Sequence, residues 1–202
     1  MQLSTINLFS IVGWLGFFLG GFLLGGVPFG YLMGKYIKNV DVRQFGSGSI
    51  GATNIWRALG IKYAIFTFLL DGLKSLVPVF LVHRLGTGGG TMAIVMLLMT
   101  VSGHIFSPWL GLRGGKGISS FILGLAVLDF RLFLVMILCW SLIFCLSRIS
   151  GLASLVSTTV TLISSCFIMR SIDSWLMIAI YTLIVWAHRK NIRDLISRAT
   201  KR

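Results

Sequence analysis

Long apolar segments separated by short polar connections run through the chain. A membrane-spanning helix needs about 20 predominantly apolar residues, and the pattern predicts seven such spans. Their approximate bounds are residues 6–36, 61–82, 91–106, 118–128, 132–146, 152–169 and 175–187. The first is long because Gly and Pro interrupt it, and a polar loop over residues 37–60 follows it. We expect an all-α, polytopic membrane bundle that forms a single domain over residues 1–202.

Two of the predicted spans, residues 118–128 and 132–146, are shorter than a full crossing requires. They could instead form a re-entrant pair around Asp129-Phe130-Arg131, because non-helical backbone is tolerated at membrane depth when protein surrounds it. That arrangement would leave five spans and the same sidedness of the chain. The pattern leaves both alternatives open.

Composition excludes a soluble protein, because 56% of the 202 residues are hydrophobic, 11% are charged and the mean hydropathy is +0.93. The formal net charge is +13, which in a soluble chain would suggest a nucleic-acid partner. Here the basic residues are spread over short connections and form no hydrophilic domain. We therefore expect no nucleic acid, and instead a lipid bilayer and an anionic substrate.

The basic residues fall unevenly on the two sides of the predicted bundle. One side receives three, Arg84, Arg131 and Arg170, and Lys74 lies inside a span. The other side receives fourteen, so the positive-inside rule places it and the C-terminus in the cytoplasm, with the N-terminus outside. These residues are Lys35, Lys38, Arg43, Arg57, Lys62, Arg113, Lys116, Arg148, Arg189, Lys190, Arg193, Arg198, Lys201 and Arg202.

Three segments on the predicted cytoplasmic side have the composition of phosphate-binding sites. They are residues 46–54 (GSGSIGATN) with Arg57, residues 103–117, and residues 188–193 (HRKNIR). Backbone N–H groups of small-residue loops bind oxyanions, and arginine and lysine side chains add positive charge. We expect the three segments to meet at one face of the membrane.

Two nucleotide-binding motifs match these segments only in part. Gly46-x-Gly48-x-x-Gly51 follows a membrane span and not a β-strand, so it does not predict a dinucleotide site. Residues 111–117 (GLRGGKG) have the wrong glycine spacing for an ATPase phosphate loop, and Gly117 stands where a hydroxyl must reach magnesium. We therefore do not expect ATP hydrolysis.

Cysteine usage gives no sign of a metal site or a disulfide. Cys139, Cys145 and Cys166 lie singly in apolar segments, and no histidines cluster near them. We expect no metal, no cofactor, and activity in the presence of EDTA.

Six short motifs occur along the chain: residues 46–54 (GSGSIGATN), 71–74 (DGLK), 103–108 (GHIFSP), 114–117 (GGKG), 152–154 (LAS) and 188–192 (HRKNI). Through these motifs nearly the whole chain resembles the bacterial acyl-phosphate:glycerol-3-phosphate acyltransferases, the PlsY family of phospholipid synthesis. The resemblance implies a seven-span enzyme of the bacterial inner membrane, with its active site facing the cytoplasm. It also implies transfer of an acyl group from acyl phosphate to the sn-1 hydroxyl of glycerol 3-phosphate, which gives lysophosphatidic acid and phosphate.

The resemblance also implies roles for individual residues. Arg57 and Lys116 are expected to hold glycerol 3-phosphate, and His188 and Asn191 to close the site. Ser47, Thr53 and the backbone of Gly114 and Gly115 are expected to cradle the acyl phosphate. The expected catalytic residues are Ser47, Arg57, Lys116, His188 and Asn191, and the expected substrate-binding residues are Gly46, Gly48, Thr53, Asn54, His104, Gly114 and Gly115.

The chain departs from the family pattern at a few positions. Ser49 replaces the usual Asn, Ser75 the usual Gly, Arg113 a frequent Lys, and Ser119-Ser120 a common Ala-Thr. None of these changes removes a cation or the serine of the first motif. They bear on substrate preference more than on the type of reaction.

The chemistry follows from the donor. Acyl phosphate is a mixed anhydride with a good leaving group, so direct attack by the acceptor hydroxyl is sufficient. The chain has no His-x4-Asp dyad, because Gly88, Trp109 and Arg193 stand five residues after its three histidines. The hydroxyl proton can go to His188 or to a phosphate oxygen of the donor, and the cation-rich surroundings favour the second route.

Some residues keep two interpretations. Asp71 and Lys74 share one face of a span, either as a structural ion pair or as pocket residues. His104 either orients the second segment or is structural. The glycines of the first span either let helices pack closely or admit the acyl chain from the bilayer.

Two rival functions have other requirements. A transporter for a small phosphate-bearing anion would also need a basic site, but the sequence has no inverted repeat and its basic motifs lie at one face. A non-catalytic lipid-binding scaffold would not require Ser47, Arg57 and Lys116 together with Asn191.

Overall fold

The computed structural model describes residues 8–85 and 89–200. In these ranges the chain forms helices and no β-strand, which confirms the all-α prediction. The α-helices are α1 (Leu8–Gly26), α2 (Phe29–Lys38), α3 (Ala52–Leu59), α4 (Ile61–Leu85), α5 (Gly89–Ile105), α6 (Ile118–Leu128), α7 (Phe130–Ser147), α8 (Ser150–Ile168), α9 (Ser171–Ala187) and α10 (Arg189–Ala199). Short 3-10 helices, η1 (Val42–Gln44) and η2 (Pro108–Leu110), follow α2 and α5. The predicted start of the first span at residue 6, and Gly88, Lys201 and Arg202, lie outside the described residues.

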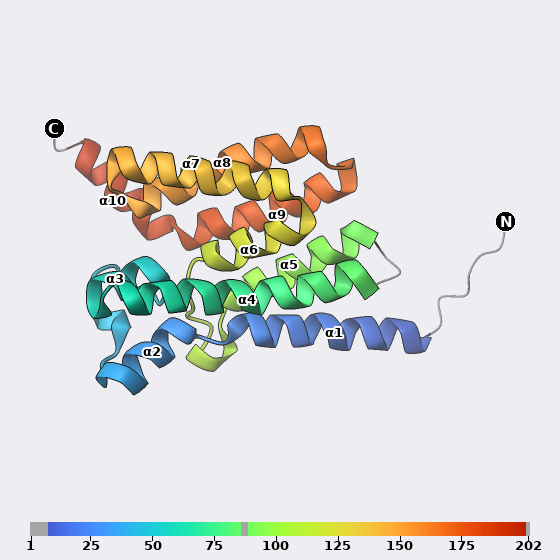
Figure 1. Ribbon diagram of the computed structural model, residues 1–202, viewed down its shortest axis with the longest axis horizontal. Helices are drawn as coiled ribbons and strands as arrows, with labels where there is room; N and C mark the ends of the chain where they lie inside the picture. Colours follow the sequence, from blue (N-terminus) through green and yellow to red (C-terminus); the bar gives the residue numbers. More distant parts are fainter. Residues whose placement is uncertain (1–7, 86–88, 201–202) are drawn as a thin grey trace.

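The long helices lie side by side along the long axis of the molecule (Figure 1). α6 has the central place, because it packs against α4, α5 and α7. Buried apolar side chains pack between the helices and form the core, among them Leu97 on α5, Phe121 and Leu125 on α6, and Ile180 on α9. Because protein encloses α6, its sequence is mostly apolar and lacks the charged face of a surface helix, and its two serines, Ser119 and Ser120, are buried.

Length and composition give five helical segments that can cross a membrane, or six if α9 and the start of α10 count as one span bent by 56°. α6 has only 11 residues, which span about 16 Å of a hydrocarbon layer about 30 Å thick. α7 has 18 residues and qualifies as a span by itself. Of the two spans predicted to be too short for a crossing, only α6 is therefore shorter than the membrane requires.

The first span is interrupted between α1 and α2, at Val27 and Pro28. Proline has no N–H group and disfavours helical backbone in the residue before it. The carbonyl groups that this break leaves without helical partners are satisfied from elsewhere. The Lys74 ammonium on α4 donates to the Val27 carbonyl at 2.7 Å, and the Ser107 hydroxyl donates to the Gly26 carbonyl at 2.6 Å.

Glycine allows α1 to approach α5 closely. A Cβ atom at Gly25 would collide with the backbone of Thr100, and one at Gly103 would collide with the Phe22 carbonyl oxygen. Gly13, Gly16 and Gly20, in contrast, have no neighbouring atom within 4 Å of such a Cβ. Close packing therefore explains the glycines that face α5, and not those along the outer part of α1.

The polar connection over residues 37–60 is not only a loop, because it contains η1 and α3. Val42, Ile50 and Ile55 form a small separate core that fixes this connection. α10 is a further helix that the apolar pattern did not predict. α3 and α10 lie at the same end of the molecule, opposite the start of α1 (Figure 1). This arrangement brings the first and third predicted phosphate-binding segments to one end of the bundle.

Candidate active site

A cavity of about 750 Å³ opens at the end of the bundle that carries α3 and α10. All three predicted phosphate-binding segments border it, although they are far apart in the sequence. Of the expected site residues, the cavity is lined by Gly46, Ser47, Thr53, Asn54, Arg57, His104, Lys116, His188 and Asn191. Gly48, Gly114 and Gly115 are not among the residues that line it.

Asn54 braces the first segment from within. Its side-chain amide nitrogen donates to the carbonyls of Val42 and Ser49 at 2.9 and 2.7 Å, and its side-chain oxygen accepts the Ser47 N–H at 3.0 Å. The residue is 2% exposed. Gly46 and Gly48 adopt left-handed backbone with φ of 49° and 71°, which glycine permits without strain. The polar atoms of Asn54 are thus engaged by the loop that carries Ser47.

Thr53 and Arg57 present two polar side chains on one face of α3. They are four residues apart, which places them one above the other on the helix, and both line the cavity. Gly51 precedes α3 and Gly60 ends it, so the helix is held between two glycines. The short helix thereby carries the arginine to the cavity wall.

Lys116 connects the second and third segments. Its ammonium group donates to the Asn191 side-chain oxygen at 2.6 Å. Burial, followed by the charges of Arg57 and Lys190, lowers the pKa of Lys116 from 10.5 to about 8, while the Asp194 carboxylate acts in the opposite direction. The cationic form of Lys116 is therefore less favourable here than in water, and an anion placed beside it would relieve that cost.

His188 is buried at the junction of α9 and α10. Its Nδ1 lies 2.8 Å from the Ile184 carbonyl oxygen, which can only accept a hydrogen bond. Nδ1 therefore carries the proton, and in the neutral ring Nε2 is a hydrogen-bond acceptor. The backbone turn at the end of α9 thus fixes both the orientation and the tautomer of this histidine.

Gly114 and Gly115 have a packing role that the sequence did not predict. The Gly114 N–H donates to the Ile105 carbonyl at 3.0 Å, and the Gly115 N–H donates to the His104 carbonyl at 2.9 Å. A Cβ atom at Gly114 would collide with the His104 carbonyl oxygen, and one at Gly115 with the His104 ring. Both N–H groups therefore fasten the loop to the end of α5, whereas we expected them to cradle a phosphate.

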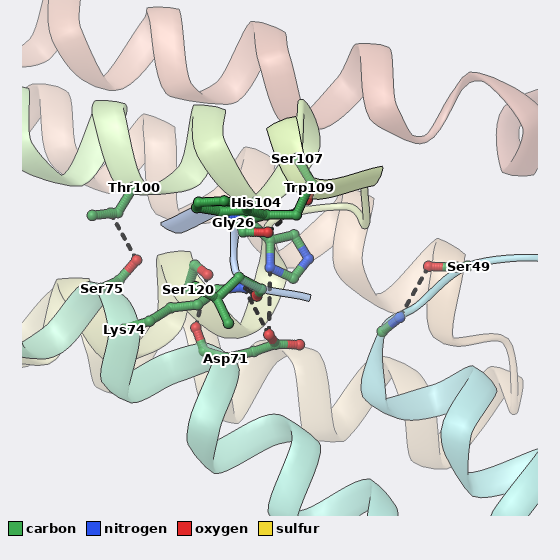
Figure 2. A network of polar contacts seen from close by, with 12 residues as sticks. Gly26, Ser49, Asp71, Lys74, Ser75, Thr100, His104, Ser107, Trp109 and Ser120 are labelled. Carbon is green, nitrogen blue, oxygen red and sulfur yellow. Dashed lines mark hydrogen bonds and ion pairs between the residues drawn. The ribbon is translucent and has the colours of Figure 1, made fainter. Parts of the chain in front are cut away.

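A buried polar network lies behind the cavity (Figure 2). Lys74 and Asp71 form an ion pair on α4 at 2.8 Å, the first of the two interpretations that their spacing left open, and Asp71 Oδ1 lies 3.8 Å from His104 Nδ1. Ser120 on α6 donates to the Asp71 carbonyl at 2.8 Å. His104 lines the cavity, but Asp71 and Lys74 do not. The distance from Asp71 to His104 is too long for a hydrogen bond, and His104 Nδ1 and Asp71 Oδ2 are buried without a hydrogen-bond partner among the described residues.

Three helices begin at the cavity wall. The first residues of α3, α6 and α8 line it, and no side chain of the described residues caps any of the three N-termini. In contrast, the Asp129 carboxylate caps the start of α7. Uncapped N-termini present backbone N–H groups and partial positive charge, which together favour a bound anion. The sequence does not indicate this feature, because it depends on where the helices point.

A large part of the cavity lining is apolar. It is built from Ile61, Ala64, Ile65 and Phe68 on α4, Ile118 and Ile122 on α6, and Ile137 and Phe144 on α7. Ile65 is 52% exposed, so this wall reaches the outer surface of the bundle. The cavity therefore combines a cationic end with an apolar side, which suits a molecule that is anionic at one end and hydrocarbon at the other.

The cavity also contains residues that the sequence predictions left out. Arg148, Ser150 and Asp194 line it, as does Ser154, whose hydroxyl accepts a hydrogen bond from Trp140 Nε1 at 3.1 Å. Ser154 belongs to the short motif at residues 152–154, so the sequence carried a signal for it. Arg148 belongs to no motif. Asp194 directly follows the segment at residues 188–193, but an acidic side chain is not expected in a site for an anion.

Comparison with known proteins identifies the family of the chain. A sequence profile described as glycerol-3-phosphate acyltransferase matches residues 15–198. A glycerol-3-phosphate acyltransferase of Myxococcus xanthus is 37% identical over 183 residues, covering 90% of this chain and 95% of the relative.

Crystal structures of PlsY, an integral membrane glycerol 3-phosphate acyltransferase, are also similar. The glycerol 3-phosphate form gives a TM-score of 0.86 at 32% identity, and the lysophosphatidic acid form 0.83 at 31%. Each comparison covers 92% of both chains. The chain therefore belongs to the PlsY family of integral membrane glycerol-3-phosphate acyltransferases.

Proposed function

We propose that the chain transfers an acyl group from acyl phosphate to the sn-1 hydroxyl of glycerol 3-phosphate, giving lysophosphatidic acid and inorganic phosphate. The observation that carries the proposal is a single cavity with a cationic end and an apolar wall. Both substrates bear phosphate and repel each other, so the site has to neutralise both. Arg57, Lys116 and the N-termini of α3, α6 and α8 supply that positive potential.

The acceptor end of the site is formed by Arg57 and Lys116. The guanidinium of Arg57 offers two parallel N–H donors to a phosphate, and Lys116 contributes a point charge. The Asn191 side-chain oxygen accepts a hydrogen bond from the Lys116 ammonium at 2.6 Å, and a phosphate oxygen would compete for the same ammonium protons. Ser47 and Thr53 provide hydroxyl donors near the donor phosphate. The acyl chain would lie along the apolar wall between α4 and α7.

The reaction needs no covalent enzyme intermediate. The sn-1 hydroxyl oxygen attacks the acyl carbon, the bond between that carbon and the bridging phosphate oxygen breaks, and inorganic phosphate leaves. The hydroxyl proton goes to an oxygen of the departing phosphate. His188 Nε2 is the alternative acceptor, since its Nδ1 proton is committed to Ile184. Side-chain cations suffice for these steps, so we expect activity to persist in EDTA.

We further propose a single domain over residues 1–202 in the bacterial inner membrane, with seven crossings and the cavity facing the cytoplasm. In this arrangement α6, buried among α4, α5 and α7, counts as a crossing despite its 11 residues. Most of the basic residues then lie at the cavity end, in agreement with the positive-inside rule. Cysteine accessibility from each side of sealed vesicles tests this sidedness.

A product assay tests the proposed reaction. Purified protein with acyl phosphate and glycerol 3-phosphate should form lysophosphatidic acid and one phosphate per product, acylated at the sn-1 position. Arg57→Ala and Lys116→Ala should lower kcat/KM by about 100-fold or more, because each removes a charged hydrogen-bond donor. Uptake of glycerol 3-phosphate into proteoliposomes without any product would instead favour a transporter.

A further inference from the structure

A recess of about 360 Å³ continues the main cavity where α3 faces the end of α7. It is lined by Thr53, Trp56, Arg57, Phe144 and Arg148, which also line the main cavity. Arg57 binds the acceptor phosphate in the proposed site, whereas Arg148 has no role there. The recess therefore adds a second arginine, from a different helix end, to a space that substrates can reach.

Neither arginine of the recess forms an ion pair with another described residue, unlike two other surface arginines. Arg43 contacts Asp41 at 2.6 Å and Arg131 contacts Asp129 at 2.7 Å, in each case an aspartate two residues earlier. No carboxylate lines the recess itself. Two guanidinium groups that share a recess without an acid form a site for an anion, and their planar donor sets match phosphate.

The backbone at Arg148 also indicates a role for its side chain. Arg148 ends α7 with a φ of 57°, in the left-handed region where helices usually carry glycine. Its N–H donates to the Phe144 carbonyl at 2.9 Å. Ser147 stabilises the turn, because its hydroxyl donates to the Ile143 carbonyl at 2.6 Å and accepts the Ile149 N–H at 3.2 Å. The chain thus keeps a long side chain where glycine would be easier to accommodate, and that side chain lines the recess.

We infer that Arg148 is a substrate-binding residue that holds, together with Arg57, a phosphate group in the recess between α3 and α7. Trp56 and Phe144 form the apolar part of the wall. Arg57 and Arg148 are both exposed, so an anion from solution can reach the two guanidinium groups. The phosphate belongs either to glycerol 3-phosphate or to the acyl donor, since both carry the same anionic group. This inference deepens the proposed function and rests on it for the identity of the two substrates.

The test compares variants that suit left-handed backbone. Arg148→Asn and Arg148→Gly remove the guanidinium group. Arg148→Lys keeps one positive charge without the planar guanidinium. Lys62→Ala is the control, because it removes an exposed charge at the start of α4 that lines neither the main cavity nor the recess. Initial rates give KM for each substrate and kcat, and calorimetry gives the Kd of inorganic phosphate. Folding is checked by the elution of purified protein as a single species.

Arg148→Asn should raise the KM of one phosphate-bearing substrate by roughly 10-fold or more, with kcat changed by less than about 3-fold. The same variant should weaken the binding of inorganic phosphate by a similar factor. Arg148→Lys should give KM and Kd values between those of Arg148→Asn and the wild type, and Lys62→Ala should give wild-type values. A higher KM for glycerol 3-phosphate would assign the recess to the acceptor, and one for acyl phosphate would assign it to the donor.

The inference is overturned if folded Arg148→Asn keeps both KM values and the phosphate Kd within about twofold of the wild type. An equal weakening of phosphate binding in Lys62→Ala would also overturn it, because the effect would then come from surface charge in general. If the wild type makes no product from acyl phosphate, the proposed function fails instead. The phosphate Kd of wild type against Arg148→Asn still decides whether the recess binds an anion.

Discussion

Lys116 and Asn191, 75 residues apart in the sequence, are joined by a hydrogen bond of 2.6 Å across the mouth of the cavity. The bond links the loop after α5 to the start of α10. The Asn191 amide lies so close to Gly151 that a Cβ atom there would collide with it, which fixes α8 against the same contact. One pair of side chains thus sets the relative positions of three segments around the proposed phosphate site.

Changing Asn191 tests how this pair affects substrate binding. In Asn191→Asp, a carboxylate would pair with the Lys116 ammonium and repel an incoming phosphate, so we expect KM for glycerol 3-phosphate to rise by about 100-fold. Asn191→Ala removes the hydrogen bond without adding a charge and should raise KM by only about tenfold. Steady-state kinetics of the two variants provide the measurement. Equal KM values in both would contradict an electrostatic role for Lys116.

The pH dependence of activity should reflect Lys116. Its pKa of about 8 means that the ammonium loses its charge as the pH rises above 8, so kcat/KM for glycerol 3-phosphate should fall there. Lys116→Arg should remove this descending limb, because arginine stays protonated. A wild-type profile that stays flat from pH 7 to about pH 10 would contradict the assignment.

Unfolding is not the cause of this predicted decline. The pKa of Lys116 is lower in the folded state than its ordinary value of 10.5, so between about pH 8 and 10.5 the unfolded chain binds more protons. Through Lys116, stability therefore increases with pH across that window. Thermal denaturation measured at pH 8 and pH 9.5 separates this contribution from the loss of activity.

Gly115 should tolerate no side chain. In Gly115→Ala the new methyl group would meet the His104 ring, so the loop that carries Lys116 has to move. We expect activity to fall by at least about tenfold, together with a lower melting temperature. Gly20→Ala is the matched control, since a Cβ atom there meets nothing within 4 Å and alanine favours a helix. Wild-type activity in Gly115→Ala would contradict the packing described for His104.

The buried Asp71–Lys74 pair should affect folding more than substrate binding. Lys74→Met leaves the Asp71 carboxylate uncompensated, at a cost of about 3–5 kcal/mol, so the yield of folded protein should collapse. The double variant Asp71→Asn with Lys74→Met removes both charges and should recover part of the yield. Fluorescence-detected size-exclusion chromatography measures this. A normal yield of Lys74→Met with a raised KM would instead identify Lys74 as a pocket residue.

The apolar pattern of the sequence predicted the long helices well. α6 begins and ends at the predicted residues, and the ends of α7 and α8 differ from those of the predicted spans by about two residues at most. α3 and α10 were missed because both are short and rich in polar residues, so they carry no membrane signal. Their helical structure depends on packing, such as that of Ile55 against Val42 and Ile50.

The motifs indicated which segments border the cavity, but not what each residue does there. Asn54 and Gly115 lie in motifs, yet the structure gives them bracing and packing roles through Ser47 and His104. Those roles depend on contacts between segments that the sequence does not reveal. Arg148 follows an apolar span like any other cation at a membrane interface. Only the packing of α7 against α8 brings its side chain to the cavity.

The most direct test of the proposed site is an experimental structure with glycerol 3-phosphate bound. We expect the phosphate to lie in the 750 Å³ cavity, within hydrogen-bond distance of both Arg57 and Lys116, with the Lys116–Asn191 contact altered. A phosphate bound elsewhere, with Arg57 and Lys116 still without an anion, would contradict the proposal that this cavity joins the two substrates.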